Sequence, residues 1–290
     1  MQNTVKQFIT VVMISTAMLI ISGCTVRLTE ASFIAHDKAP VAFSTEFTQA
    51  LQLAMPNNAI IPLSLEASDH VKLNGFFIDN PNSNTTLVFY QGNGMNIQPH
   101  CLSALTTLST LNTDILVMDR RGIGASEGKP KIKNILSDAQ QQLDYLQQRF
   151  QPEKIILHGY SLGSFIAADL ARNNKVDALV MQGSATNADD WVDEKNPWYM
   201  APFMTLEMPQ DFRNIDNQQV VAQSYSGPLL VIAAEDDEEV PPALAEKLFA
   251  ASKSANKQLI MVPNVGHQGM LDDVTTMQQY QDFIPFRVSK

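Results

Sequence analysis

A serine flanked by two glycines is the strongest chemical signal in the chain, in Gly159-Tyr160-Ser161-Leu162-Gly163. An apolar, β-branched run precedes this motif, and apolar residues at helical spacing follow it. A tight strand-to-helix turn projects a serine hydroxyl away from the backbone, and the glycines remove Cβ clashes there. We therefore predict that Ser161 is a nucleophile. The first N–H of the helix, that of Leu162, is predicted to stabilise the developing oxyanion.

A nucleophilic serine needs a base, and behind a turn of this kind an acid and then a histidine follow along the chain. The chain has five histidines, and His267 is the only one after Ser161. It lies in Asn264–Gly269, a glycine-containing loop just after an apolar run. We predict that His267 is the base. His36, His70, His100 and His158 are predicted to be structural.

The acid that orients this histidine is expected just after the apolar run Leu229–Ala233. Five consecutive acidic residues, Glu235–Glu239, follow that run. Most of them are expected to form a solvated loop, with one carboxylate turned inward to hold the imidazole. The residues alone leave open which of the five does so.

Short apolar runs with β-branched residues must position these groups. Between the runs, apolar residues recur every three or four positions in segments 97–111, 132–150, 162–170 and 244–249. Strands that alternate with helices predict a mainly parallel sheet covered by helices on both faces. The predicted strands are Ile60–Leu65, Val71–Ile78, Thr86–Tyr90, Asp114–Met118, Lys154–His158, Ala178–Met181, Leu229–Ala233 and Gln258–Val262.

Two further loops carry a family resemblance. Asp119–Gly128 matches the pattern D-x-R-G-x-G-x-S-x-G, and Asp237–Pro241 matches D-x-x-V-P. With the serine motif, they resemble the α/β-hydrolase superfamily, in its esterase or serine aminopeptidase-like branch, over roughly residues 60–285. The resemblance implies an α/β-hydrolase fold. It also implies that Asp237, and not Asp236, is the acid.

The same resemblance implies a second oxyanion donor. The family usually has His-Gly-Asn after its third strand, where this chain has Gln91-Gly92-Asn93-Gly94. By this match the Asn93 N–H acts beside the Leu162 N–H. Gln91 replaces a histidine that braces the loop, so we expect the change to affect efficiency more than mechanism.

These residues imply a serine hydrolase that cleaves carboxylic esters of a small acyl substrate through an acyl-enzyme, without a cofactor or a metal. A thioesterase would use the same groups. A peptidase of the aminopeptidase type would need acids to hold the substrate amine, and Asp189, Asp190, Asp193 and Glu194 are candidates. A catalytically silent binding protein is the third alternative. The net charge of −10 and the lack of a basic patch argue against nucleic acid as a partner.

The N-terminus resembles a bacterial lipoprotein signal peptide. One charged residue, Lys6, precedes the apolar stretch Phe8–Ile21, which runs into Ile21-Ser22-Gly23-Cys24. We expect cleavage before Cys24 and attachment of lipid, including palmitate, to this cysteine. An ordinary signal or an uncleaved anchor is the alternative. Thr25 follows the cysteine, so the expected location is the cell envelope, at the outer membrane if the host is Gram-negative, facing the periplasm or the surface.

The expected organisation has three parts. Residues 1–23 are the signal peptide, residues 24–58 a tether and lead-in, and residues 59–290 one hydrolase domain, expected to act as a monomer. With 290 residues and 45% hydrophobic side chains, the chain is long enough for such a core. Segment 184–226 is rich in aromatic residues, methionine and proline. It predicts a cap over a pocket, with an extra packed helix as the alternative.

Overall fold

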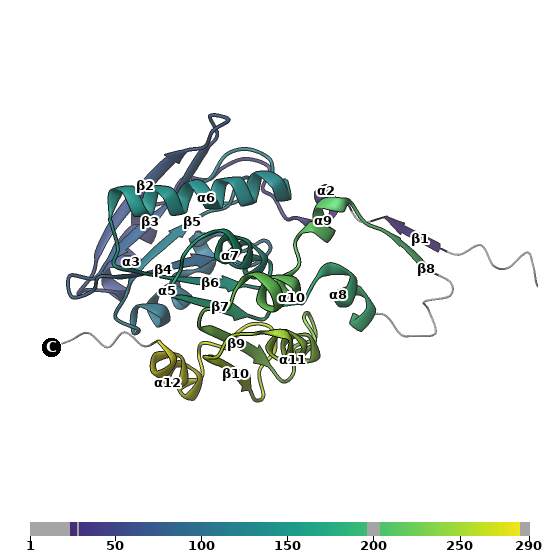
Figure 1. The fold of residues 1–290 in the computed structure, drawn as a ribbon. Helices are drawn as coiled ribbons and strands as arrows, with labels where there is room; N and C mark the ends of the chain where they lie inside the picture. Colours follow the sequence, from purple (N-terminus) through teal and green to yellow (C-terminus); the bar gives the residue numbers. More distant parts are fainter. Residues whose placement is uncertain (1–23, 28, 196–203, 285–290) are drawn as a thin grey trace, which may run out of the picture.

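Eight strands form one sheet in the order β10-β9-β7-β6-β4-β5-β3-β2 in the computed structural model of the chain (Figure 1). The structure describes residues 24–27, 29–195 and 204–284. All pairs from β5 to β10 are parallel, whereas β3 pairs antiparallel with both β2 and β5. The strands are β2 (Ala59–Glu66), β3 (Lys72–Asp79), β4 (Thr85–Tyr90), β5 (Asp114–Met118), β6 (Lys154–Tyr160), β7 (Ala178–Gln182), β9 (Leu229–Ala234) and β10 (Lys257–Val262).

All eight apolar runs of the sequence are strands of this sheet, so the predicted fold class is confirmed. Strand β4 shows why such runs are apolar throughout. Its side chains alternate between two hydrophobic clusters, with Leu87 and Phe89 in one and Val88 and Tyr90 in the other. Both faces are therefore covered, as expected of the parallel part of a sheet.

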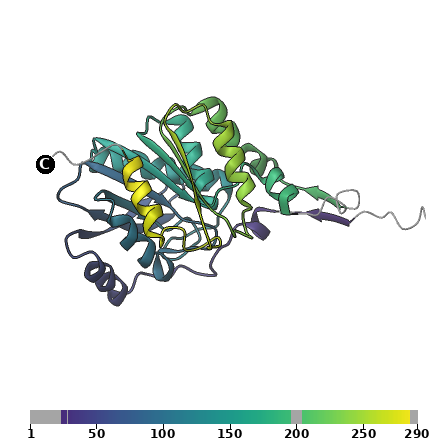
Figure 2. The same ribbon diagram turned by 90° about the horizontal axis from the view of Figure 1, so that it is seen from below.

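Helices cover each face. One cluster takes in α6 (Ile132–Arg149), α7 (Leu162–Asn173) and α11 (Pro242–Ala251). The other takes in α3 (Thr45–Ala54), α5 (Leu102–Ser109) and α12 (Val274–Phe283), and Figure 2 shows the yellow α12 lying along the sheet. The sequence did not predict α3 and α12. The single helical face expected over 97–111 is divided into α4 (Ile97–His100) and α5.

Segment 184–226 extends from the carboxyl edge of the sheet. It contains α8 (Ala188–Lys195), β8 (Met204–Glu207), α9 (Gln210–Asn214), α10 (Asn217–Gln219) and the short π-helix Val220–Ser224. Its strand β8 pairs in parallel with β1 (Cys24–Arg27), and the two form an arm that projects from the body in both views (Figures 1 and 2). Pro197, Trp198 and the other residues of 196–203 lie outside the described residues, as does the predicted signal peptide 1–23.

The residues before β2 contact the domain closely. Phe47 and Leu51 of α3 and Ile34, which follows α2 (Glu30–Phe33), are buried. Among the described residues, no helix combines the length and the apolar character needed to cross a membrane.

Candidate active site

Ser161 lies at the turn between β6 and α7, at the carboxyl edge of the sheet. Its backbone has φ 52° and ψ −119°, a conformation that residues with a side chain rarely adopt. Strain of this kind costs on the order of 1–3 kcal/mol and persists only where the surroundings enforce it. Here the Ser161 N–H donates to the Gln182 carbonyl at 2.8 Å, which ties the turn to β7.

The two glycines of the motif permit close backbone approaches. A Cβ at Gly159 would overlap the backbone of Gly163 and Ser164, and a Cβ at Gly163 would overlap the carbonyl of Tyr90. The elbow can therefore form only with glycine at both positions. Leu162 is the first residue of α7, so its N–H has no acceptor one turn earlier in the helix.

His267 and Asp237 are hydrogen-bonded to each other at the end of the sheet next to Ser161. Nδ1 of His267 lies 2.7 Å from Oδ2 of Asp237, and both side chains are buried. The other oxygen of Asp237 accepts from the backbone N–H groups of Glu239 at 2.9 Å and Val240 at 2.8 Å. Asp236 is exposed. Of the two neighbouring aspartates, therefore, Asp237 contacts the histidine.

Tyr160 and Gly183 hold the imidazole in place, and sequence reasoning missed both. The Tyr160 ring stacks on that of His267 with centroids 5.1 Å apart, and its hydroxyl donates to the His267 carbonyl at 3.0 Å. Gly183 has φ 56°, and a Cβ there would lie 3.0 Å from Cε1 of His267. Tyr160 stands at the variable position of the serine motif, which gave no signal for this role.

The predicted oxyanion loop lies against the elbow. A Cβ at Gly92 would be 3.4 Å from Cβ of Ser161, so the backbone of this loop passes close to the serine. Asn93, the next residue, lines a pocket together with Ser161 and Leu162. The Asn93 side chain contacts the N-terminal segment, since its Nδ2 donates to the Phe33 carbonyl at 2.7 Å and its Oδ1 accepts from the Ala35 N–H at 2.9 Å.

Arg120 supports the predicted oxyanion loop by a hydrogen bond to its backbone. Its Nη2 donates to the Gly92 carbonyl at 3.2 Å, and burial lowers the pKa of its guanidinium to about 10. Gln91, which stands where the family has its bracing histidine, is buried too. Within the described part of the chain, the Gln91 side-chain amide has no hydrogen-bond partner. The contact from Arg120, and not one from Gln91, therefore braces this loop.

The loop Asp119–Gly128, which carried part of the family resemblance, has a structural role. Both Asp119 oxygens accept backbone N–H groups, from Ile97 at 2.7 Å and Ala125 at 2.9 Å. Arg121 forms an ion pair with buried Asp138 at 2.7 Å. These bonds hold the loop Asp119–Gly128 against the sheet. They thereby fix Arg120 where it contacts the Gly92 carbonyl.

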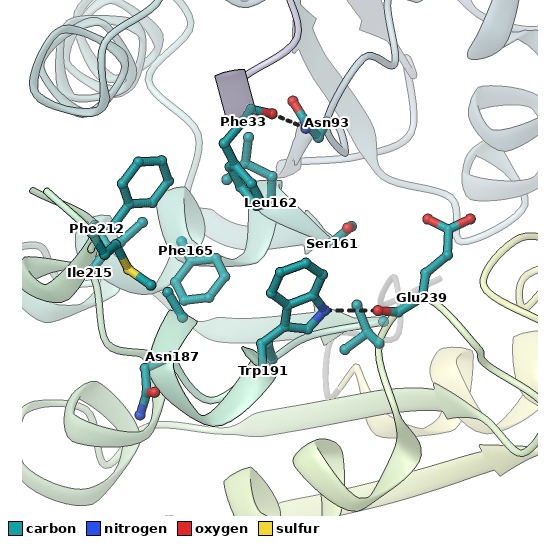
Figure 3. A pocket seen from close by; sticks show the side chains of 15 residues that line it. Phe33, Asn93, Ser161, Leu162, Phe165, Asn187, Trp191, Phe212, Ile215 and Glu239 are labelled. Carbon is teal, nitrogen blue, oxygen red and sulfur yellow. Dashed lines mark hydrogen bonds between the residues drawn. The ribbon is translucent and has the colours of Figure 1, made fainter. Parts of the chain in front are cut away.

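Two cavities meet at Ser161. The first, which we call the apolar pocket, has a volume of about 190 Å³. Segment 184–226 supplies seven of its fifteen lining residues, and Figure 3 shows Phe165, Phe212 and Ile215 on one side of Ser161 and the Glu239 carboxylate on the other. The apolar pocket is lined by Phe33, Asn93, Ser161, Leu162, Phe165, Gly183, Ala185, Asn187, Ala188, Trp191, Met208, Phe212, Ile215, Glu239 and Val240.

The second cavity, the polar cleft, is larger and more open, with a volume of about 500 Å³. Ser161, Asn93 and Glu239 line both cavities, but His267 lines only the polar cleft of the two. Its further polar side chains include His100 and Asp272.

The N-terminal segment forms one wall of the apolar pocket, which the sequence did not suggest. The Phe33 ring packs edge-on against Trp191 at 5.9 Å and Phe212 at 5.2 Å. The Trp191 indole N–H donates to the Glu239 carbonyl at 2.8 Å, as Figure 3 also shows. Segment 29–37 thereby joins the oxyanion loop to segment 184–226.

The acidic residues considered for binding a substrate amine do not line either cavity. Asp189 forms an ion pair with Arg213 at 3.4 Å, and Glu194 forms one with Lys247 at 2.8 Å. Asp190 accepts from the Thr186 hydroxyl at 2.6 Å. Neither these residues nor Asp193 are among the described residues that line the two cavities.

Among the residues that the structure describes, no three His, Cys, Asp or Glu side chains are grouped so that they could hold a metal ion. Cys101 is buried, and burial raises the pKa of its thiol.

Comparisons with known proteins agree with this architecture. The profile of the family described as alpha/beta hydrolase fold matches residues 85–214. The chain is 29% identical to the alpha/beta hydrolase domain-containing protein WAV2 of Arabidopsis thaliana, over 68% of each chain. It is 30% identical to the lysophosphatidylserine lipase ABHD12 of Danio rerio, over 60% of this chain and 50% of that one.

Solved structures share the fold. The esterase Pf2001 of Pyrococcus furiosus superimposes with a TM-score of 0.68 over 87% of this chain and 97% of that one, at 17% identity. Est1E of Butyrivibrio proteoclasticus, solved with ferulic acid bound, gives a TM-score of 0.62 over 79% of this chain and all of that one, also at 17% identity.

Proposed function

Since this chain has the α/β-hydrolase fold, we propose that it is a serine hydrolase that cleaves carboxylic esters through an acyl-enzyme. The observation that carries the proposal is the hydrogen bond of 2.7 Å between His267 and Asp237, beside a strained Ser161 in the same cleft. A serine is a weak nucleophile on its own, and an oriented imidazole is the group that activates it.

In this proposal each group has one step. Asp237 accepts from Nδ1–H of His267, which leaves Nε2 as the base. Ser161 Oγ attacks the ester carbon and transfers its proton to Nε2, while the N–H groups of Asn93 and Leu162 stabilise the oxyanion. The imidazolium then protonates the leaving alcohol as the C–O bond breaks. Water, activated by the same nitrogen, releases the acid from Ser161.

Esters are favoured because the apolar pocket suits an acyl chain. A relative named as a lipase supports this assignment. A thioesterase would use the same residues and remains the second candidate. The aminopeptidase alternative loses its support, because Asp189 and Glu194 are held in ion pairs outside both cavities.

We further propose that Cys24 carries lipid and anchors the enzyme to the cell envelope, as a monomer. The support for this anchor is the apolar stretch that ends in Ser22-Gly23-Cys24.

Substitution of the nucleophile tests the enzymatic proposal and separates it from the silent binding protein. We expect Ser161→Ala to abolish both ester hydrolysis and labelling by a fluorophosphonate probe. The Tm should change little, because Ser161 is only partly buried and alanine keeps its Cβ. Labelling of the alanine variant at the wild-type rate would exclude Ser161 as the nucleophile. Absence of labelling in the wild type would favour the binding protein.

A further inference from the structure

The two cavities divide the substrate between them, if the proposed function holds. The leaving alcohol must receive its proton from His267, so it must lie beside that imidazole. Of the two cavities, His267 lines only the polar cleft. The alcohol therefore occupies the polar cleft and the acyl chain the apolar pocket.

The charge of the polar cleft bears on which alcohols fit. Its described lining includes the carboxylates of Glu239 and Asp272 and the imidazoles of His100 and His267, but no lysine or arginine. Glu239 is nearest to the proposed chemistry, with Oε2 3.9 Å from Nε2 of His267. Its side chain is 67% exposed, and its backbone is fixed by the bond from Trp191.

We propose that Glu239 makes this cleft select esters of cationic or neutral alcohols over esters of anionic alcohols. A positive group on the leaving alcohol comes within a few ångströms of the Glu239 carboxylate and is attracted to it. A phosphate or sulfonate in the same place is repelled, and no basic side chain of the described lining compensates for that repulsion. The apolar pocket does not change this preference, because it receives the uncharged acyl chain.

Three butyrate esters of similar size test the proposal. They are the ester of choline, that of its uncharged carbon isostere 3,3-dimethylbutanol, and that of the anionic 2-sulfoethanol. Because the acyl part is constant, the ratios of kcat/KM between them report the leaving-group cleft alone. We expect wild type to rank cationic first and anionic last, at low ionic strength and pH 8.

Glu239→Gln keeps the shape of the side chain and removes its charge. We expect this variant to lower the choline-to-dimethylbutyl ratio by about fivefold and to raise the anionic-to-neutral ratio by a similar factor, as for one exposed charge at short range. Glu238→Gln is the matched control, since it removes one charge from the same loop but does not line either cavity. It should leave both ratios unchanged.

Two results would overturn the selection by Glu239. One is an active Glu239→Gln variant with wild-type ratios, and the other is an equal change in Glu238→Gln. If wild type hydrolyses none of the three esters and resembles Ser161→Ala with ester and thioester substrates alike, the proposed function fails, and this inference fails with it.

Discussion

Asp236 and Asp237 are neighbours with very different surroundings. The Asp237 carboxylate is buried and uses both oxygens, one toward His267 and one toward two backbone N–H groups. Asp236 is exposed, and an exposed charge is screened by solvent and salt. Only the first of these carboxylates can hold the imidazole in one tautomer.

We therefore expect Asp237→Asn to lower kcat by about 10⁴-fold, as the loss of such a partner does elsewhere. Asp236→Asn should keep kcat within about twofold of wild type, because its charge is exposed. Steady-state kinetics on one ester, with Tm measured for both variants, check this. Equal losses in the two variants would show that the acidic loop acts as a whole.

A second histidine, His158, is buried and has a structural role. His158 on β6 has Nε2 3.0 Å from the Gln182 side-chain oxygen and Nδ1 3.0 Å from the Tyr280 hydroxyl. The neutral ring can donate to the first and accept from the second. Burial lowers the pKa of His158 to about 4.

The contribution of this histidine to stability should fall in mild acid. Its folded-state pKa lies below the unfolded value of 6.5, so the unfolded chain binds the proton more tightly. The stability that neutral His158 contributes is then lost as pH falls from about 6.5 toward 4, by about 2 kcal/mol between pH 7 and pH 5. Urea unfolding at both pH values should therefore show that wild type loses about 2 kcal/mol relative to His158→Asn between pH 7 and pH 5. Asp114 and Asp119, whose pKa values burial raises to about 6, act in the opposite direction in both proteins.

At this scale the sequence predicts the residues whose type is restricted by motif. Ser161 stands between two glycines, and His267 is the only histidine that follows it. Tyr160 and Glu239 could not be found this way. Their roles depend on which side chains the folded loops bring into contact, and no local spacing encodes that.

Among the elements, segment 29–37 has a clear part in the site. Its Phe33 ring closes the apolar pocket against Trp191 and Phe212, and its backbone binds the Asn93 side chain. The last residue of the segment is held by a second loop, because Asp37 accepts from the Gly124 N–H at 2.7 Å. Side-chain changes in this segment can therefore alter the pocket without removing the segment.

Phe33→Ala should enlarge the apolar pocket at the wall nearest Ser161. We expect kcat/KM for short acyl esters to fall about tenfold, since they lose an aromatic contact, and longer chains to lose less. A series of p-nitrophenyl esters from C2 to C10 measures the shift of the optimum toward longer chains. Phe43→Ala is the control, because this ring packs on Phe76 in the other core and lines neither cavity at Ser161. A parallel fall for all chain lengths would contradict the role of Phe33 as a wall.

The elements that the sequence missed have weak patterns for physical reasons. Helix α12 buries Thr276, Tyr280 and Phe283 but exposes its apolar Val274, so its apolar positions do not mark one face. The helical backbone is interrupted within α4, at Gln98, which has φ −105° and ψ 121° and precedes Pro99. A residue before proline disfavours the helical conformation, whereas the apolar spacing continued across it.

At the scale of the whole molecule, the proposed lipid anchor and one wall of the apolar pocket lie on one short stretch of chain. Cys24 begins β1, which pairs with β8, and Phe33 at the end of α2 lines the apolar pocket. An acylated Cys24 would hold this arm at the surface of a bilayer. The pocket would then be close to the membrane, and acyl chains could enter it without crossing much water.

We therefore expect Cys24→Ser to act on substrate access as well as on attachment. Wild type should incorporate radiolabelled palmitate and the variant should not, because a serine lacks the thiol that receives the lipid. Toward a water-soluble butyrate ester the two proteins should have equal kcat/KM, since Cys24 lines neither cavity. Toward a long-chain ester embedded in vesicles the variant should be about tenfold slower or worse, because it no longer concentrates at the bilayer. Equal palmitate incorporation would refute the anchor, whereas equal rates on the vesicle ester would refute only the pocket's access from the membrane.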